Sequence, residues 1–276
     1  MIVIKPEERK ELKIPQFRCL QTGKCCSHIR GMVELGDKKF IEENAYGKMP
    51  LVQLHPVEKI AFPLWDWEAR RFSKWQHEAD VDARIIPSRA ILDLNTGKAV
   101  IVTYMMDADS CPFLKKGKCS IYMHKRAYIC RLFPFNRGPF LSLHQEPDKF
   151  NMFGSCPAVE RIMEAMPTET NAMVEYLANA FPDGSFTNAV QNDIVIEWTN
   201  KTIIELMKKK LVRPAMSYPY EFLKRRIENA EKIDLTDFLV ESGLYTREEM
   251  DNLINQFDDN IQAKERIGEF LDDNIS

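Results

Sequence analysis

The sequence has 276 residues, 45% of them hydrophobic and 29% charged, which is the balance of a folded protein with one large or two ordinary domains. A formal net charge of −3 does not make the whole molecule a polyanion binder, and 11 glycines and 15 prolines exclude a low-complexity chain. No apolar run approaches the ~20 residues that span a bilayer. The amino-terminal segment also lacks the apolar region of a signal peptide. We therefore expect a cytoplasmic protein without a membrane segment.

The first half of the chain predicts short elements separated by loops. A helix is expected from near Asp37, which is a good amino-terminal cap. Residues 84–106 predict a β-hairpin, because two β-branched and aliphatic runs flank the turn residues 95–97. One group of aromatic residues is typical of a hydrophobic core: Phe62, Trp65, Trp67, Phe72 and Trp75.

From residue 157 onward the pattern becomes helical. Thr246 and Glu249 form a capping box at the start of the last predicted helix. The apolar periodicity predicts helices over residues 168–181, 187–211, 219–230, 235–242 and 246–271. We expect an α+β protein: a small, irregular, cysteine-rich metal-binding domain with a β-hairpin over residues 1–157, and an all-helical region over residues 158–276.

The carboxy-terminal segment is strongly acidic. Residues 231–276 hold 13 acidic and 4 basic side chains, a net charge of −9. We interpret these acidic side chains as the solvated face of a helical region. A protein partner that docks there is the alternative, which the amphipathic stripes alone do not require.

The cysteines carry the chemistry of this sequence. In a chain expected to stay reduced, clustered cysteines favour metal binding or catalysis over disulfides. Thiolates bind zinc or iron–sulfur clusters. All seven lie in the first 157 residues: Cys19, Cys25, Cys26, Cys111, Cys119, Cys130 and Cys156.

The segment from Cys111 to Cys119 has the composition of a metal knuckle, because Gly117 allows a tight turn just before the second cysteine. Residues 105–140 hold seven basic and two acidic side chains. We expect these cations to offset the charge of bound thiolates and not to form a nucleic-acid patch. Three stand out for this supporting role: Lys118, Arg126 and Arg131.

Two motifs carry a family resemblance. Gly23-Lys-Cys25-Cys26 follows Cys19, and a long second motif runs from Cys111-Pro-Phe-Leu to Cys130-Arg-Leu-Phe-Pro-Phe135. Over roughly residues 17–157 the chain resembles the CxxCxxCC cysteine-cluster family of YkgJ-like proteins. The resemblance implies a zinc- or iron-chelating domain without an assigned reaction. Some relatives are described as flagellin lysine methylases.

The sequence departs from the family pattern at three places. Thr22 stands where the family has a cysteine, Ala127 replaces the proline of an Arg-Pro pair, and the Cys119–Cys130 interval is one residue longer. Because one of eight cysteines is missing, a second complete four-thiolate site is in doubt. His28 is a possible replacement ligand and His124 a weaker one.

The leading hypothesis is a metal-binding protein. Cys111, Cys119 and Cys130, with Cys19 or Cys156, would hold one ion or cluster. Cys25 and Cys26 would complete or share a second, or only one of this adjacent pair is a ligand. The metal is zinc in a structural site or iron in an iron–sulfur cluster, and the sequence leaves both open.

The alternative hypothesis is a metal- or iron–sulfur-dependent enzyme for methyl transfer or redox chemistry. The sequence has no glycine-rich nucleotide loop and no hydrolase or zinc-protease motif. We therefore assign no catalytic residue.

Overall fold

A computed structural model describes residues 14–31, 33, 35–46, 49–122, 126–135, 138 and 156–272. The chain divides into two compact units, each built from separated segments. The larger unit comprises residues 21–130 and 195–259, and the smaller one comprises residues 1–20, 131–194 and 260–276. Independent folding of residues 1–157 and 158–276 remains a prediction.

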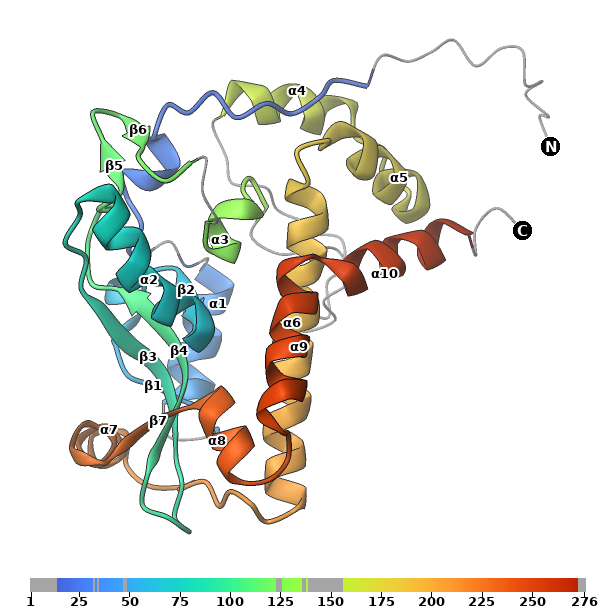
Figure 1. Cartoon of the computed structure of the whole chain (residues 1–276). Coiled ribbons are helices and arrows are strands. Elements are labelled where there is room, and N and C mark those ends of the chain that lie inside the picture. The colour runs from blue at the N-terminus through green and yellow to red at the C-terminus, as the bar shows by residue number, and fades with distance from the viewer. Residues whose placement is uncertain are drawn as a thin grey trace. The chain divides into compact units, whose positions relative to one another are not determined.

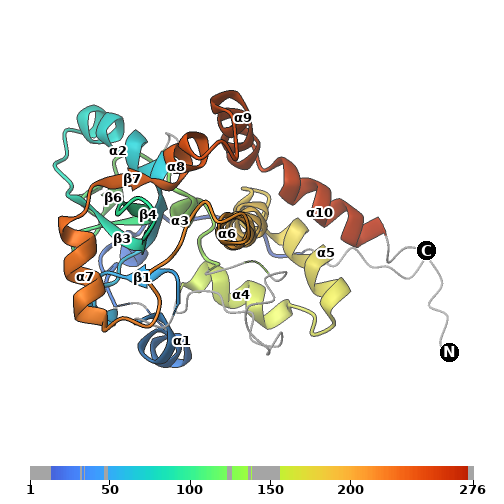
Figure 2. The same cartoon turned by 90° about the horizontal axis from the view of Figure 1, so that it is seen from below.

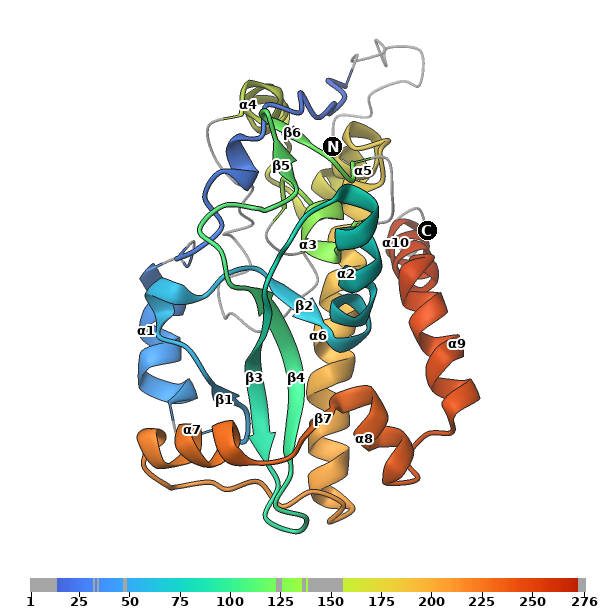
Figure 3. The same cartoon turned by 60° about the vertical axis from the view of Figure 1, so that its left-hand side comes forward.

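A mixed sheet forms the centre of the larger unit (Figure 3). Its strands follow the order β1-β3-β4-β2, and β7 also pairs with β4. The β3–β4 hairpin confirms the predicted one, and its turn is closed by the buried Asp93 carboxylate, which accepts the Asn95 and Thr96 amides. The strands are β1 (Val52–Gln53), β2 (Pro63–Trp65), β3 (Ile85–Leu92), β4 (Ala99–Met106) and β7 (Lys232–Asp234).

Strand β7 comes from the part of the chain that was expected to be helical. It runs parallel to the start of β4, with Ala99 opposite Lys232 and Ile101 opposite Asp234. The α+β class is confirmed, and the helical carboxy-terminal part contributes this one short strand to the sheet of the larger unit (Figure 1).

The other elements of the larger unit are short, except for α2, α9 and residues 195–208 of α6 (Ser185–Lys208). A small second hairpin pairs β5 (Leu114–Lys115) with β6 (Lys118–Cys119). Short turns of other helix types lie at Lys24–Cys26 and Val57–Lys59 (both 3₁₀) and at Ile41–Ala45 (π). The α-helices are α1 (Leu35–Phe40), α2 (Asp66–Ala79), α3 (Tyr128–Arg131, whose last residue falls in the smaller unit), α7 (Tyr220–Asn229), α8 (Leu235–Glu241) and α9 (Arg247–Asp258).

Two hydrophobic clusters hold these elements together. In the first, Leu223 and Ile227 of α7 pack on the β1, β3 and β4 residues of the sheet. Figure 2 shows α7 beside β1 and β3. The second joins α2 to the cysteine segments through Phe72, Trp75 and Phe113. Four of the five predicted core aromatics are buried and Phe62 is partly buried in the second cluster, which confirms the core interpretation.

The smaller unit is helical within its described residues. It contains α4 (Pro157–Ala165), α5 (Thr170–Ala180), residues 185–194 of α6 (Ser185–Lys208) and α10 (Ile261–Asp272). The Phe17 amide donates to the Ala180 carbonyl at 2.7 Å, which ties the amino-terminal segment to the end of α5. No helix in the described ranges is long and apolar enough to cross a membrane.

One helix prediction was wrong. The expected helix over residues 246–271 is two helices, α9 and α10, because Asn260 between them adopts a left-handed conformation with φ of +55°. The capping box at its start is confirmed, since the Thr246 hydroxyl accepts the Glu249 amide and the Glu249 carboxylate accepts the Thr246 amide.

Candidate metal centre

The turn that carries Cys25 and Cys26 begins at a glycine. Gly23 has φ of +71°, and its carbonyl accepts the Cys26 amide at 3.0 Å, which closes a single 3₁₀ turn. A Cβ atom at Gly23 would lie 2.6 Å from the Leu114 Cδ1 and 2.9 Å from the Gly117 carbonyl oxygen. Only glycine therefore lets this turn lie directly against the β5–β6 hairpin.

The β5–β6 hairpin is the predicted knuckle. Lys116 and Gly117 both have positive φ, so the chain reverses in two residues and places Leu114 opposite Cys119. Cys111 precedes the hairpin, and its amide donates to the Cys26 carbonyl at 2.8 Å. That backbone bond joins two cysteine segments that lie far apart in the sequence.

The third cysteine segment is α3. The Cys130 amide donates to the Ala127 carbonyl at 2.9 Å, within the first turn of this short helix. Cys111, Cys119 and Cys130 all pack against the hydrophobic cluster of Phe72 and Phe113. Three segments of the larger unit thus bring five cysteines to one region: Cys25, Cys26, Cys111, Cys119 and Cys130.

The five thiols influence one another electrostatically. Burial, with smaller contributions from the charges of Cys119 and Cys25, raises the pKa of the Cys111 thiol to about 11. Burial also raises the pKa of the Cys130 thiol, and the charge of Cys111 adds a smaller rise. Bringing several thiolates together is therefore costly without a cation, and a bound metal ion supplies the charge that relieves this cost.

Cys25 and Cys26 behave as a coupled pair. Their sulfur atoms lie 3.8 Å apart and share a hydrogen bond. That bond lowers the pKa of the Cys25 thiol to about 7, and it raises the pKa of the Cys26 thiol. One proton thus leaves the pair near neutral pH, while loss of the second is opposed.

The donor set has the right chemistry for zinc or iron, since both ions bind thiolates. Among the described residues, no group of three or more histidine, cysteine, aspartate or glutamate side chains already has the spacing of a metal shell. The thiols of the larger unit would therefore have to turn toward a common point around an ion.

The remaining predicted ligands are not among these five cysteines. Cys19 and Cys156 belong to the smaller unit, where the Cys156 carbonyl accepts the Val159 and Glu160 amides at the start of α4. His28 is exposed on the chain that follows Cys26. Their role as ligands stays a prediction, and His124 lies outside the described residues.

Arg126 is the predicted supporting cation that the structure places beside the thiols. Its guanidinium lies 4.4 Å from the centre of the Tyr122 ring. Its charge lowers the pKa of Cys25, after the larger effect of the Cys26 hydrogen bond, and it partly offsets the rise at Cys130. Lys118 is exposed on β6, and Arg131 belongs to the smaller unit. Support by these two residues stays a prediction.

Sequence reasoning missed Glu68. This buried carboxylate accepts the Tyr128 amide at 2.7 Å, at the start of the helix that carries Cys130. The local signal was its position three residues after Trp65, typical of a helix start, which gave no indication of a contact 60 residues away.

Comparison with known proteins points to the same part of the chain. Residues 18–157 match the model of a family named CxxCxxCC, which is described as "Putative zinc- or iron-chelating domain". The matched range contains all seven cysteines. No curated protein and no solved structure matches the chain.

Proposed function

From the premise that this chain belongs to the CxxCxxCC family, we propose that its cysteine thiolates chelate a zinc or iron ion. The observation that carries the proposal is the convergence of Cys25, Cys26, Cys111, Cys119 and Cys130 from three segments of one compact unit. Four thiolates suffice for a closed tetrahedral site, so the larger unit holds enough donors for one ion or cluster.

The chain's own residues prepare this chemistry in two ways. The Gly23 turn and the Cys26–Cys111 backbone bond fix the position of two thiol segments before any ion binds. Arg126 supplies a positive charge beside the thiols, which favours their ionised form. An ion bound there supplies charge neutralisation and, in an iron–sulfur cluster, electron transfer.

The test begins with full-length protein purified without oxygen, followed by metal analysis and an absorption spectrum of the same sample. Stoichiometric zinc without visible absorption indicates a structural site, and several irons per chain with a broad band near ~400 nm indicate an iron–sulfur cluster. A preparation that neither retains nor takes up zinc or iron contradicts the proposal.

A substitution then locates the site. Cys130→Ala is expected to abolish stoichiometric metal, while Ser110→Ala, at an exposed position next to Cys111, is expected to leave it unchanged. The same measurement on Cys19→Ala and Cys156→Ala decides whether the smaller unit contributes ligands. Unchanged metal in Cys130→Ala would remove this thiol from the ligand set.

The finer alternatives follow from the same sample. An enzyme for methyl transfer or redox chemistry requires an open metal position or a bound cofactor, whereas a structural site requires four protein ligands. Thiolate chemistry of this kind requires a compartment that keeps cysteines reduced, as the cytoplasm does. The acidic carboxy-terminal helices remain a proposed surface for a protein partner.

A further inference from the structure

Glu68 is a buried carboxylate that connects two helix starts. It is 2% exposed, and an ionised carboxylate is stable away from water only when hydrogen bonds satisfy its oxygens. Its Oε2 accepts the Trp65 amide at 3.0 Å, at the start of α2. Its Oε1 accepts the Tyr128 amide at 2.7 Å, at the start of α3. One side chain thereby fixes α3 to α2.

The helix held in this way carries a thiol of the metal centre. Tyr128 is the first residue of α3, and Cys130 follows two residues later. A helix of four residues is too short to be stable alone, so its orientation depends on tertiary contacts. The Glu68 hydrogen bond and the packing of Tyr128 and Cys130 provide those contacts.

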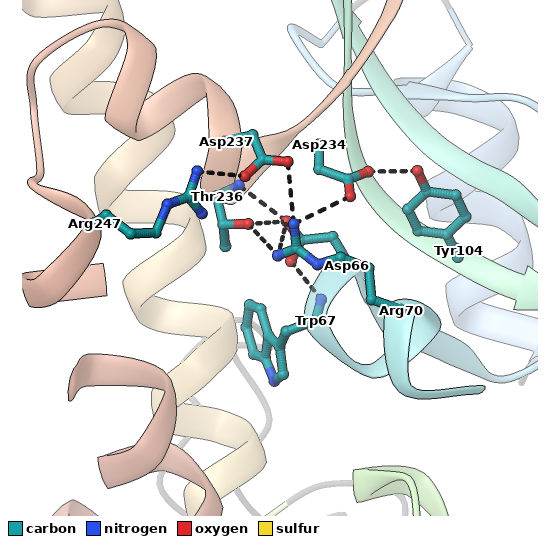
Figure 4. A network of polar contacts seen from close by, with 8 residues as sticks. All are labelled: Asp66, Trp67, Arg70, Tyr104, Asp234, Thr236, Asp237 and Arg247. Atoms are coloured by element: carbon teal, nitrogen blue, oxygen red, sulfur yellow. Dashed lines mark hydrogen bonds and ion pairs between the residues drawn. The ribbon is translucent and has the colours of Figure 1, made fainter. Parts of the chain in front are cut away.

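A second carboxylate in the same turn has a different partner. Asp66 is 1% exposed, and its Oδ2 accepts the Thr236 amide at 2.9 Å and the Thr236 hydroxyl. Arg70 joins this network through Asp237 and the Thr236 hydroxyl (Figure 4). Asp66 thus connects α2 to α8, whereas Glu68 connects α2 to the cysteine helix.

The charge of Glu68 does not itself favour a thiolate. Burial is the main cause that raises the pKa of Cys130, and the Glu68 carboxylate shifts this pKa in the same direction. Any benefit of Glu68 to metal binding must therefore come from the position that it gives to the helix.

We propose that Glu68 is a positioning residue of the metal centre, which holds α3 so that the Cys130 sulfur faces Cys111 and Cys119. This inference rests on the proposed metal-binding function. It predicts that the hydrogen bond to Tyr128 is needed for metal affinity, beyond any contribution that it makes to folding.

The test compares Glu68→Ala with Asp66→Ala in the full-length, reduced protein. Each substitution removes one buried carboxyl group from the first turn of α2, and only the first removes the hydrogen bond to α3. The probe is Co²⁺, whose dissociation constant is measured by competition with a chelator. Its sulfur-to-cobalt absorption reports how many thiolates bind. Near-ultraviolet circular dichroism and a urea titration report folding.

We expect Glu68→Ala to weaken Co²⁺ binding about 10- to 100-fold, the range for loss of a hydrogen bond that orients a metal ligand. The sulfur-to-cobalt absorption should fall by the amount that one bound thiolate contributes. Asp66→Ala should lose stability in urea and keep the wild-type Co²⁺ affinity and spectrum. If the two variants bind Co²⁺ equally well, the positioning role is rejected while the proposed function stands.

Two further outcomes complete the test. If the wild-type protein binds neither Co²⁺ nor zinc nor iron, the proposed function fails and the positioning role fails with it. If Glu68→Ala does not fold, Glu68→Asp replaces it, because the carboxylate is kept but withdrawn by one methylene from the Tyr128 amide. A wild-type Co²⁺ affinity in that variant, or failure of both variants to fold, rejects the positioning role.

Discussion

Gly23 offers a direct test of how the two thiol segments are assembled. An alanine at this position would have to adopt a left-handed conformation, which costs about 1–2 kcal/mol. Its Cβ would also lie 2.9 Å from the Gly117 carbonyl oxygen, and a backbone atom cannot rotate away as the nearby Leu114 side chain can. We estimate that this crowding adds about 1–3 kcal/mol.

Gly97 is the matched control. It has φ of +74°, close to the value for Gly23, and no atom lies within 4 Å of a Cβ built there. Gly97→Ala therefore carries the conformational cost without the crowding, and the difference between the two variants isolates the contact between the Gly23 turn and the β5–β6 hairpin.

Both variants are unfolded in urea without metal, and tryptophan fluorescence reports the folded fraction. A competition titration then measures the Zn²⁺ affinity of each variant. Gly97→Ala should lose about 1–2 kcal/mol and keep its Zn²⁺ affinity. Gly23→Ala should lose about 2–5 kcal/mol and bind Zn²⁺ at least about tenfold more weakly, since each 1.4 kcal/mol is a factor of ten. Equal stability losses and equal Zn²⁺ affinities in the two variants would refute the need for close contact between the Gly23 turn and the β5–β6 hairpin.

Two further predictions concern protons and domain boundaries. Burial raises the pKa of Cys111 to about 11 and also raises that of Cys130, so both thiols carry protons at pH 7 that a metal must displace. The Zn²⁺ affinity should therefore rise by at least about two orders of magnitude per pH unit between pH 6.5 and 8, measured by chelator competition, and a flat profile contradicts ligation by both. A chain ended at residue 157 tests the predicted boundary at 157/158. A soluble, metal-loaded fragment would support it, whereas a fragment that fails to fold, because the sheet loses β7 and the α7 packing, would contradict it.

Local patterns predicted local structure well. The β3–β4 hairpin follows from two β-branched runs around a turn, and the capping box at Thr246 follows from side chains that satisfy amides within one turn. The turn at Gly117 follows in the same way from a residue with access to positive φ. In each case the interactions that decide the structure lie within a few residues of one another.

Features that depend on contacts between distant segments could not be predicted from such local patterns. Strand β7 has three residues, too few for an alternating pattern, and it exists because β4 offers it hydrogen bonds. The break at Asn260 interrupts a periodic apolar stripe that continues on both sides. The cysteine groups were visible in the sequence, but their assembly depends on the Cys26–Cys111 bond and on Glu68, which join distant segments.

The pairing of β7 with β4 has a consequence for how the protein is made. The edge of Ala99–Ile101 that β7 occupies stays open until the ribosome has synthesised more than a hundred further residues. At about 5–20 residues per second this delay lasts roughly 6–25 seconds. Throughout it the nascent chain presents an apolar strand edge together with its thiols, and such an edge readily pairs with other chains. Chaperones that cover this edge during synthesis are therefore expected to increase the yield of folded protein.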